Sequence, residues 1–290
     1  AARELGVGAG AARLVSGTLT AHVELERRLA RLLGEERALL LGSGYLAHVG
    51  VLPALAGEGD LIYSDQLNHA SIVDGCRLSR ARVRVFRHRD VEHLARLMAG
   101  DAGADGQRLI VTESVFSMDG DLAPLVELCE LAERRGAWVL VDEAHGFGVR
   151  GAGGGGVVQE LGLTGRVPIR MGTLGKAAGV YGAYVAGCEE LARYLVNSAR
   201  SFIYSTALPV PLCAAAVAAV ELLEGPEGRE RRAALAANVA SLRRGLAGQG
   251  WRVPADGPAT DSAILPLHVG DPRRAVRSEE HTSELQSLLI

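Results

Sequence analysis

The chain has 290 residues, a formal net charge of -3 and 48% hydrophobic residues. The near balance of 31 basic and 34 acidic side chains argues against a nucleic-acid-binding protein, which would show a basic excess or stripe. No uncharged apolar run approaches the roughly 18 residues of a membrane span. The hydrophobic content is sufficient for one large domain or two smaller ones. The four cysteines lie far apart without a C-x-x-C pair, which disfavours a disulfide framework or a thiolate zinc site and fits a reducing, cytoplasmic setting.

In chain order, short apolar runs alternate with helical periodicity from about residue 35 onward. The apolar runs predict strands at 38–41, 61–63, 83–86, 109–113, 138–142, 169–172 and 184–186. The helical pattern predicts helices at 90–99, 124–135, 189–200, 209–223 and 229–246. Asp90 would be the N-cap of the first of these helices, and Pro124 would lie in the first turn of the second. Strands that alternate with helices indicate an α/β fold with a mostly parallel sheet.

The same pattern divides the chain into segments. We expect an N-terminal segment over 1–34, a large domain over 35–224 and the start of a smaller α+β domain over 225–276, with strand-like runs at 251–253 and 263–269. Gly225 and Pro226 mark the expected boundary. Because the chain opens on Ala1 without Met, we expect that the first segment is the truncated end of a longer protein. The third segment shows only the start of a domain pattern, so we expect it to be truncated as well. Residues 277–290 resemble a translated sequencing adapter and are left out of fold and site reasoning.

Lys176 is the only lysine among the 31 basic residues. A guanidinium stays protonated and is a poor nucleophile, whereas an amine can lose its proton and form a Schiff base. A single lysine in an arginine-rich chain is therefore a candidate for chemistry that arginine cannot perform. The alternative is an ordinary solvated surface lysine.

Other polar residues follow the ends of predicted strands, where ligands bind in open α/β sheets. Gly44 and Tyr45 lie in a glycine-rich turn before a helical stretch, which suits a phosphate but is often only a tight turn. Asp142 ends a buried strand and needs a cation, either a ligand pyridinium or an arginine. Asp-Glu-Ala-His at this point could also belong to a nucleotide hydrolase, but no Walker-type phosphate loop accompanies it. Thr173 precedes Lys176 at the end of another strand.

One cofactor needs an amine for a Schiff base, a carboxylate for a ring nitrogen and a phosphate cradle, and this cofactor is pyridoxal 5′-phosphate. His69 could stack on its ring, or it could be a capping or core histidine. Ser117 and His145 could each donate a hydrogen bond to the phenolic oxygen of the ring, although a loop serine is usually a turn residue. Together these residues predict a pyridoxal-phosphate site.

The chain resembles the α-oxoamine synthases, a branch of the fold-type-I pyridoxal-phosphate enzymes, over residues 1 to about 276. Seven motifs occur in the order of that family: Arg-Leu-Val-Ser-Gly at 13–17, Gly-Ser-Gly-Tyr at 42–45, Asn-His-Ala-Ser at 68–71, Val-Phe-Ser-Met-Asp-Gly-Asp at 115–121, Asp-Glu-Ala-His-Gly at 142–146, Gly-Thr-Leu-Gly-Lys at 172–176 and Tyr-Ser-Thr at 204–206. One departure is Gly-Gly-Gly at 154–156, where the family often has Gly-Arg-Gly. The resemblance implies a three-layer large domain with a mostly parallel sheet.

The resemblance also implies a role for each candidate residue. Lys176, His69 and Asp142 would be catalytic, with Lys176 as the Schiff-base lysine and Asp142 on the pyridine nitrogen. The cofactor-binding set would be Gly44, Tyr45, His69, Ser117, Asp142, His145, Thr173, Lys176, Ser205 and Thr206. Family members are homodimers with interface active sites, so Ser205 and Thr206 would reach the phosphate in the neighbouring subunit. No metal is implied.

The activity implied is a decarboxylative condensation of an amino acid with an acyl thioester. The chain looks most like the branch that joins L-alanine to a pimeloyl group, carried by CoA or by acyl carrier protein, in biotin biosynthesis. The other branches use glycine with succinyl- or acetyl-CoA, or serine with a long acyl chain, and they stay open as alternatives. A non-catalytic paralogue that binds the cofactor is a further alternative.

Overall fold

The computed structural model describes residues 1–251, 253 and 262–271, so the adapter-like residues 277–290 lie outside the described part. Its centre is a seven-stranded sheet with the strand order β1-β7-β6-β5-β4-β2-β3. The strands are β1 (Arg37–Leu41), β2 (Leu61–Asp65), β3 (Arg82–Phe86), β4 (Arg108–Glu113), β5 (Trp138–Asp142), β6 (Ile169–Thr173) and β7 (Ala183–Gly187). Only β7 runs antiparallel to its neighbours, β1 and β6. The prediction of seven strands in a mostly parallel sheet is confirmed.

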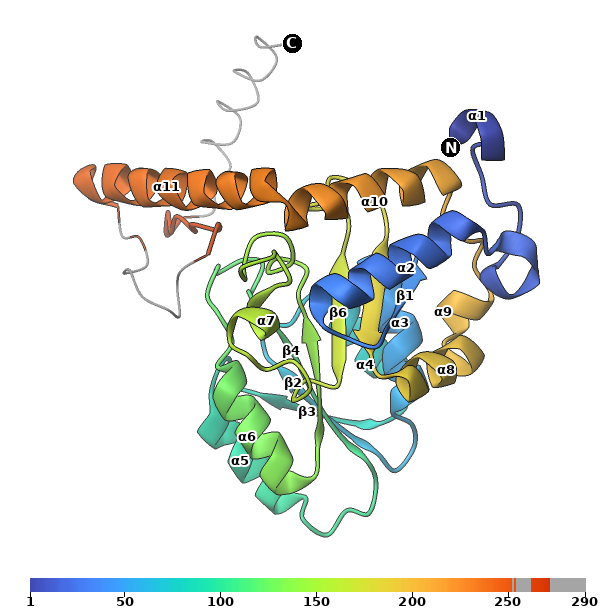
Figure 1. The fold of residues 1–290 in the computed structure, drawn as a ribbon. Helices are drawn as coiled ribbons and strands as arrows, with labels where there is room; N and C mark the ends of the chain where they lie inside the picture. The colour runs from blue at the N-terminus through green and yellow to red at the C-terminus, as the bar shows by residue number, and fades with distance from the viewer. Residues whose placement is uncertain (252, 254–261, 272–290) are drawn as a thin grey trace.

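The helices lie between and after these strands (Figure 1). They are α1 (Ala2–Leu5), the π-helical turn η1 (Arg13–Gly17), α2 (Thr20–Leu33), α3 (Gly44–Leu55), α4 (Ala70–Leu78), α5 (Val91–Gly100), α6 (Leu125–Arg135), α7 (Val157–Glu160), α8 (Glu189–Ser198), α9 (Arg200–Ile203), α10 (Val210–Glu224) and α11 (Pro226–Gly248). Asp90 caps α5 as predicted, because its Oδ1 accepts a hydrogen bond from the backbone N–H of His93.

Helices cover both faces of the sheet and give three layers. Successive residues of a strand point to opposite faces, so Leu39 and Leu41 of β1 pack among side chains of α3, α4, α8 and α9. Ala38 and Leu40 instead pack on α2 and α10, which lie side by side in Figure 1. The strands other than β3 are thus largely buried on both faces, as is typical of parallel sheets, whereas in the edge strand β3 only Phe86 is buried.

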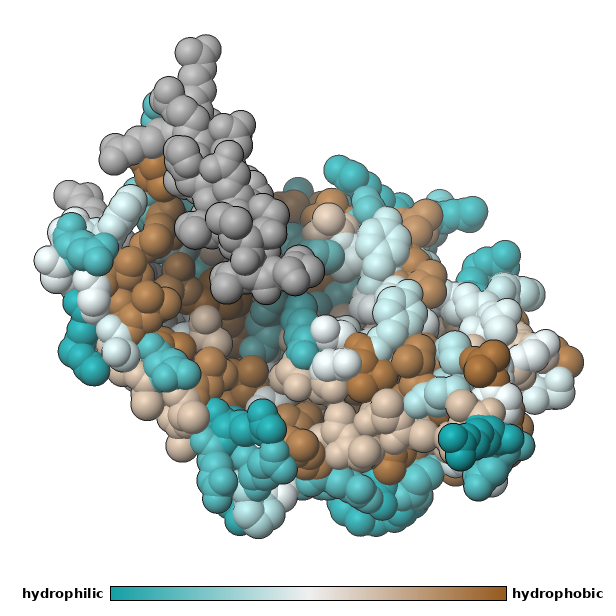
Figure 2. Space-filling view, turned by 90° about the horizontal axis from the view of Figure 1, so that it is seen from above, coloured by the Kyte–Doolittle hydropathy of each residue, from teal (hydrophilic) through white to brown (hydrophobic). Residues whose placement is uncertain are grey.

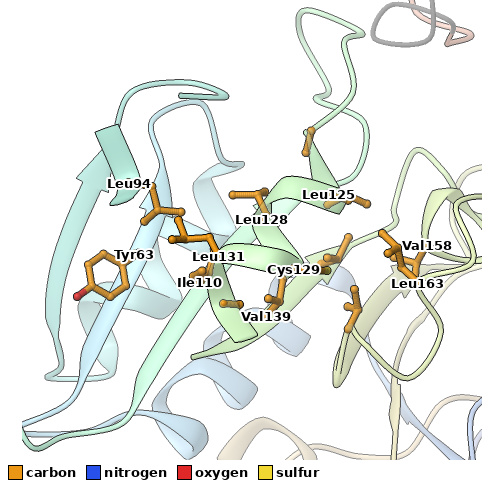
Figure 3. Packing of buried hydrophobic residues seen from close by; sticks show 14 of the residues in the cluster. Tyr63, Leu94, Ile110, Leu125, Leu128, Cys129, Leu131, Val139, Val158 and Leu163 are labelled. Carbon is orange, nitrogen blue, oxygen red and sulfur yellow. The ribbon is translucent and has the colours of Figure 1, made fainter. Parts of the chain in front are cut away.

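A second cluster covers the other half of the α2 and α10 face (Figure 3). Leu94 of α5 and Leu128 and Leu131 of α6 pack against Tyr63 of β2 and Ile110 of β4. Because α6 crosses over between β4 and β5, this packing fixes the points where these two strands end. Those points matter for the site, since both strands end in a carboxylate residue.

Two predicted segments differ from the structure near the end of the large domain. The predicted helix 189–200 is wrong in its length, because α8 ends at Ser198 and α9 begins at Arg200. The side chains of Asn197 and Ser198 bond back to the carbonyls of Arg193 and Tyr194, a pattern that competes with regular helix. Pro124 is also placed differently, since it is the N-cap of α6 and not part of its first turn.

The predicted strands of a second domain are not found. Residues 263–269 have no strand partner in the described part of the chain, and neither Trp251 nor Val253 lies in a strand, with residue 252 between them outside it. A strand is stabilised by pairing, so an apolar run alone does not form one. The predicted boundary does coincide with a break: α10 ends at Glu224 and α11 starts at Pro226, a favoured first helical residue. The small domain itself stays a prediction.

The surface carries hydrophobic side chains among hydrophilic ones, as the view from above shows (Figure 2). The most exposed large hydrophobic residues include Val15, Met118 and Tyr204. Among the described helices, none combines the length and hydropathy that a membrane crossing needs.

Candidate active site

The predicted site residues come from loops at one edge of the sheet, here called the carboxyl edge, where β1, β2, β4, β5 and β6 end. Gly44 follows β1, His69 follows β2, Ser117 follows β4, His145 follows β5 and Lys176 follows β6. Parallel strands end at the same edge, which is why residues far apart in sequence meet there. The prediction that the strand ends form one site agrees with this topology.

The lone lysine contacts a predicted partner. Lys176 Nζ lies 2.7 Å from His145 Nε2. Although Lys176 as a residue is exposed, the surrounding protein removes enough water from its amine to lower its pKa, a trend that Asp142 and Glu113 oppose. Burial, together with the charges of Lys176 and His69, lowers the pKa of His145 to about 4. His145 is therefore a neutral imidazole at pH 7, and its Nε2 can accept a hydrogen bond from the amine.

Asp142 is a buried carboxylate that forms no ion pair with an arginine or lysine in the described part of the chain. Its Oδ1 accepts a hydrogen bond of 2.8 Å from the backbone N–H of Ala144, and its Oδ2 lies 3.5 Å from His48 Nε2. Burial raises the pKa of Asp142 to about 6, although the Ala144 hydrogen bond and the charges of Lys176 and His69 lower it. In the described ranges no arginine pairs with Asp142, so the arginine alternative from the sequence finds no support there.

Glu113, the last residue of β4, connects two of the predicted residues. Its carboxylate accepts hydrogen bonds from the backbone N–H groups of His69, at 2.7 Å, and of Ser117. Burial and the neighbouring Asp142 raise the pKa of Glu113 to about 8. This side chain holds the two loops that follow β2 and β4 in a fixed relation.

His69 itself is the N-cap of α4. Its Nδ1 accepts a hydrogen bond from the backbone N–H of Ser71 at 3.2 Å, so the capping interpretation is correct. The same Nδ1 lies 2.7 Å from Ser71 Oγ. These contacts fix the ring by one nitrogen only, and the exposed residue keeps its other nitrogen for a ligand.

The glycine-rich turn opens a helix, as predicted. Ser43 is the N-cap of α3, with its Oγ accepting from the N–H of Leu46 at 3.2 Å, and Gly44 is the first helical residue. Tyr45 Oη donates to Asp74 Oδ2 at 2.8 Å. At the end of β6, Thr173 Oγ1 donates to the carbonyl of Gly182 at 3.0 Å. Both segments present backbone and hydroxyl groups that suit a phosphate.

Ser205 and Thr206 stand apart from this set. Thr206 forms an isolated bridge with Ala12 of the N-terminal segment. Among the described residues, no hydrogen bond or ion pair joins Ser205 or Thr206 to Lys176, Asp142 or His145. Their predicted role toward a neighbouring subunit stays a prediction.

The chemistry of the donor set fits pyridoxal 5′-phosphate. A buried carboxylate that lacks a cation suits a protonated ring nitrogen, and an amine of lowered pKa suits an aldehyde. In the part of the chain that the structure describes, no group of three or more His, Cys, Asp or Glu side chains could hold a metal ion.

Two residues of the site were missed by sequence reasoning. Glu113 ends a strand exactly as Asp142 does, so the rule applied to Asp142 could have found it. His48 lies inside an apolar helical stretch, Leu46–Leu55 in sequence terms, and only its polarity among apolar neighbours distinguished it.

The comparison with known families identifies the class of protein. The aminotransferase class I and II family matches residues 1–287. The chain belongs to this family, whose members of known structure include pyridoxal-phosphate enzymes with the same three-layer fold. The fold class, the enzyme class and the cofactor predicted from the sequence are therefore confirmed.

The comparison with individual relatives narrows the enzyme class further. The chain is 51% identical to 8-amino-7-oxononanoate synthase of Citrifermentans bemidjiense over 265 residues, which cover 91% of this chain and 67% of the relative. A solved serine palmitoyltransferase from S. paucimobilis with bound PLP is 34% identical, with a TM-score of 0.89 over 94% of this chain and 70% of that one. The crystal structure of 8-amino-7-oxononanoate synthase from Francisella tularensis is 28% identical, with a TM-score of 0.81 over 98% of this chain and 78% of that one.

Proposed function

We propose that this chain condenses L-alanine with a pimeloyl thioester, carried by CoA or by acyl carrier protein. The products would be 8-amino-7-oxononanoate, CO₂ and the free thiol carrier, in a step of biotin biosynthesis. The main support in the structure is the contact of 2.7 Å between Lys176 Nζ and His145 Nε2, with the charge of Lys176 also acting on the buried Asp142. The support for this particular reaction is the identity of about one half to relatives named 8-amino-7-oxononanoate synthase.

Pyridoxal 5′-phosphate, when bound, supplies an aldehyde for an imine with an amine and a ring that accepts negative charge from the α-carbon of the amino acid. In our proposal Lys176 holds the aldehyde and Asp142 holds the ring nitrogen. His69 stacks on the ring, and Ser117 and His145 bind its phenolic oxygen. Gly44, Tyr45 and Thr173 bind the phosphate end, with Ser205 and Thr206 contributing from a second subunit.

Lys176 would also move the proton on which the reaction depends. Burial lowers the pKa of its amine, so a larger fraction is unprotonated near pH 7 than for a free lysine. The neutral His145 accepts a hydrogen bond from this amine and orients its lone pair. An amine so placed is a suitable base for the α-proton of the amino acid, which it would take at Nζ.

A related condensation is the second candidate function. The serine palmitoyltransferase structure superposes with a TM-score of 0.89, against 0.81 for the 8-amino-7-oxononanoate synthase structure. This observation favours a reaction of serine with a long acyl thioester. The higher identity to the alanine-using relatives, at 51% against 34%, outweighs it because substrate choice depends on side chains and the fold is common to both.

A homodimer is also part of the proposal. Tyr45, Met118 and Tyr204 are 49%, 80% and 71% exposed, and they neighbour the predicted cofactor residues in sequence. Exposed apolar side chains around a site are typical of a surface that a second subunit covers. A cytoplasmic location stays a prediction.

The substrate assignment is tested by product analysis. The protein, loaded with pyridoxal 5′-phosphate, is given alanine, glycine or serine together with pimeloyl-, acetyl-, succinyl- or palmitoyl-CoA, and products are identified by mass spectrometry. We expect 8-amino-7-oxononanoate from alanine and pimeloyl-CoA at a rate above all other pairs. A faster reaction of serine with palmitoyl-CoA would overturn the assignment in favour of the second candidate.

A further inference from the structure

His48 lies directly behind the carboxylate that we assign to the ring nitrogen. It belongs to α3, three residues after Tyr45, and only 1% of it is exposed. Its Nδ1 lies 2.9 Å from Ser71 Oγ, and its Nε2 lies 3.5 Å from Asp142 Oδ2. Among the described residues this Nε2 makes no hydrogen bond. A buried polar nitrogen without a partner is costly, so this atom calls for an explanation.

The protonation of His48 follows from its surroundings. Burial, and after it the charge of His69, lowers the pKa of His48 to about 3, so the ring is neutral at pH 7. A neutral imidazole carries one proton, on Nδ1 or on Nε2. With the proton on Nδ1, the lone pair of Nε2 would face the negative charge of Asp142 Oδ2. With the proton on Nε2, an N–H dipole points at that charge, and this second tautomer is the favourable one.

This choice determines the direction of the remaining hydrogen bonds. If His48 Nδ1 is an acceptor, Ser71 must donate its hydroxyl proton to it. Ser71 Oγ also lies 2.7 Å from His69 Nδ1, the atom that accepts the N-cap bond from the Ser71 backbone N–H at 3.2 Å. Asp142, His48, Ser71 and His69 thus form one chain of contacts.

We propose that His48 is a positioning residue that directs an Nε2 N–H toward Asp142 Oδ2, 3.5 Å away, and connects this carboxylate, through Ser71, to His69. This role rests on the proposed function, since it matters for the reaction only if Asp142 holds the ring nitrogen and His69 stacks on the ring. Asp142 Oδ1 already accepts from Ala144, so the carboxylate would be fixed at both oxygens. Each oxygen keeps a further lone pair for a ligand nitrogen.

A fixed, ionised Asp142 is what a protonated ring nitrogen needs. Lys176 and His69 lower the pKa of Asp142 through their charges, and Asp142 in turn raises the pKa of Glu113. His48 is different because it is buried and neutral, with a pKa of about 3, so its own protonation does not change with pH in the working range. We infer that His48 orients the Asp142 carboxylate. The charged groups at the carboxyl edge instead set how far Asp142 is ionised.

The tautomer can be measured without any cofactor or substrate. Long-range ¹H–¹⁵N correlation spectra of the ¹⁵N-histidine-labelled apoprotein at pH 7 report which ring nitrogen of each histidine is protonated. We expect His48 to carry its proton on Nε2, and Asp142→Asn to shift the tautomer equilibrium toward Nδ1. A His48 ring protonated on Nδ1 in the unsubstituted protein would overturn the proposal.

A pair of variants separates positioning from simple packing. The amide nitrogen of His48→Gln can reach the place of Nε2, whereas that of His48→Asn reaches only the place of Nδ1 and keeps the Ser71 contact. We expect His48→Asn to weaken cofactor binding by about tenfold or more, the range for loss of a hydrogen bond to a charged group, and His48→Gln to restore most of it. Circular dichroism and the carboxyl ¹³C shift of Asp142 in both apoproteins serve as folding and ionisation controls.

Equal cofactor affinity and equal Asp142 shifts in His48→Gln and His48→Asn would overturn the role of Nε2. A protein that shows the expected tautomer but fails to bind pyridoxal 5′-phosphate at all would instead contradict the proposed function. The two failures are therefore distinguishable.

Discussion

Asp142 and Glu143 are neighbours in the sequence, both are buried, and burial is the main cause that raises the pKa of each. Their surroundings differ completely. Glu143 accepts hydrogen bonds from Ser114 Oγ and from the backbone N–H groups of Val157 and Val158, at 2.7, 3.0 and 2.7 Å, and lies 4.0 Å from the guanidinium of Arg170. Asp142 accepts one backbone hydrogen bond and, among the described residues, forms no ion pair with an arginine or lysine.

The difference separates a carboxylate that serves the fold from one that serves a ligand. Glu143 points back into the protein, where it holds the start of α7, and Arg170 is bound in turn by the carbonyls of Leu33 and Gly155. Asp142 points to the carboxyl edge with part of its hydrogen-bonding capacity unused. A buried charge is tolerated only with partners, so we expect a bound molecule to supply the cation that Asp142 does not find among the described residues.

Glu143→Gln is expected to cause the largest change in stability. It removes one of the two carboxylates beside the fully buried guanidinium of Arg170, leaving Glu35 at 3.4 Å, and weakens the acceptors for two backbone N–H groups. The loss should be about 3 to 5 kcal/mol in the free energy of unfolding. Urea denaturation followed by circular dichroism measures it. The exposed Glu130→Gln on α6 is the control, and an equally small change in both variants would refute the structural role of Glu143.

Asp142→Asn should show the opposite balance, with a large loss of activity and little loss of stability. The pKa of Asp142 in the folded apoprotein is about 6, above that of an unfolded chain, so the folded state binds the proton more tightly. The stability contributed by this proton is present below about pH 4 and is lost as the pH rises to about 6. The Asn variant lacks this loss, so above pH 6 its apoprotein should gain stability relative to the unsubstituted protein.

The turnover rate of Asp142→Asn should fall by a factor of about 10² to 10⁴, because an amide cannot hold a protonated ring nitrogen as a carboxylate does. Steady-state kinetics with alanine and pimeloyl-CoA gives this number, and thermal denaturation from pH 4 to 8 gives the stability. A variant with near-normal turnover, or one as unstable as Glu143→Gln, would remove the distinction between the two carboxylates.

Glu113→Gln sharpens the comparison at the neighbouring strand end. With a pKa of about 8, Glu113 is mostly protonated at pH 7, and Gln is a fair substitute for that form. We expect less than about a tenfold loss of activity at pH 7, and a larger loss for Glu113→Ala, which removes the acceptor for His69 and Ser117. Since the pKa is raised, the unsubstituted protein should lose stability relative to the Gln variant as pH rises from about 4 to 8.

The direction of this change in stability is checked by measuring the unfolding of Glu113→Gln as a function of pH. The exposed Glu127→Gln serves as the control. A relative stability that moves the other way, with Glu113 increasingly favourable toward pH 8, would mean that the carboxyl group is ionised in the folded protein.

His88→Gln is expected to have the smallest effect. His88 lies between Asp65 and Asp121, at 2.9 and 3.0 Å, and connects the loop after β3 to the loop that includes Ser117. Burial opposes its charge, but the hydrogen bonds to both carboxylates outweigh burial and raise its pKa. We expect the charged His88 to contribute about 1 to 2 kcal/mol to the free energy of unfolding. This contribution should be complete below about pH 6.5 and be lost as the pH rises through the raised pKa of His88.

Unfolding measured at pH 6 and pH 9 tests this dependence, with Arg96→Gln on the exposed face of α5 as control. Equal losses of stability for His88→Gln at both values would show that the imidazole is not charged in the folded protein.

Much of this architecture could be predicted from the sequence because the strands other than β3 are largely buried on both faces and read as apolar runs between polar turns. The same pattern misled at 263–269, where an apolar run has no strand beside it in the described part of the chain. Site residues that end strands or stand in motifs, such as Asp142 and Lys176, were also predictable. Glu113 was identifiable from its place at the end of a strand, although its bonds to the His69 and Ser117 loops were not. His48 was not identifiable, because its role depends on interhelical contacts that no local spacing records.

The central claim is that Lys176 bonds covalently to pyridoxal 5′-phosphate. Borohydride reduction of the loaded protein, followed by proteolysis and mass spectrometry of the peptides, tests it most directly. The expected result is a reduced phosphopyridoxyl group on Lys176 in the unsubstituted protein and none on the same peptide in Lys176→Arg. An unmodified Lys176 peptide from a protein that holds the cofactor, or the cofactor bound only to another amine, would contradict the account.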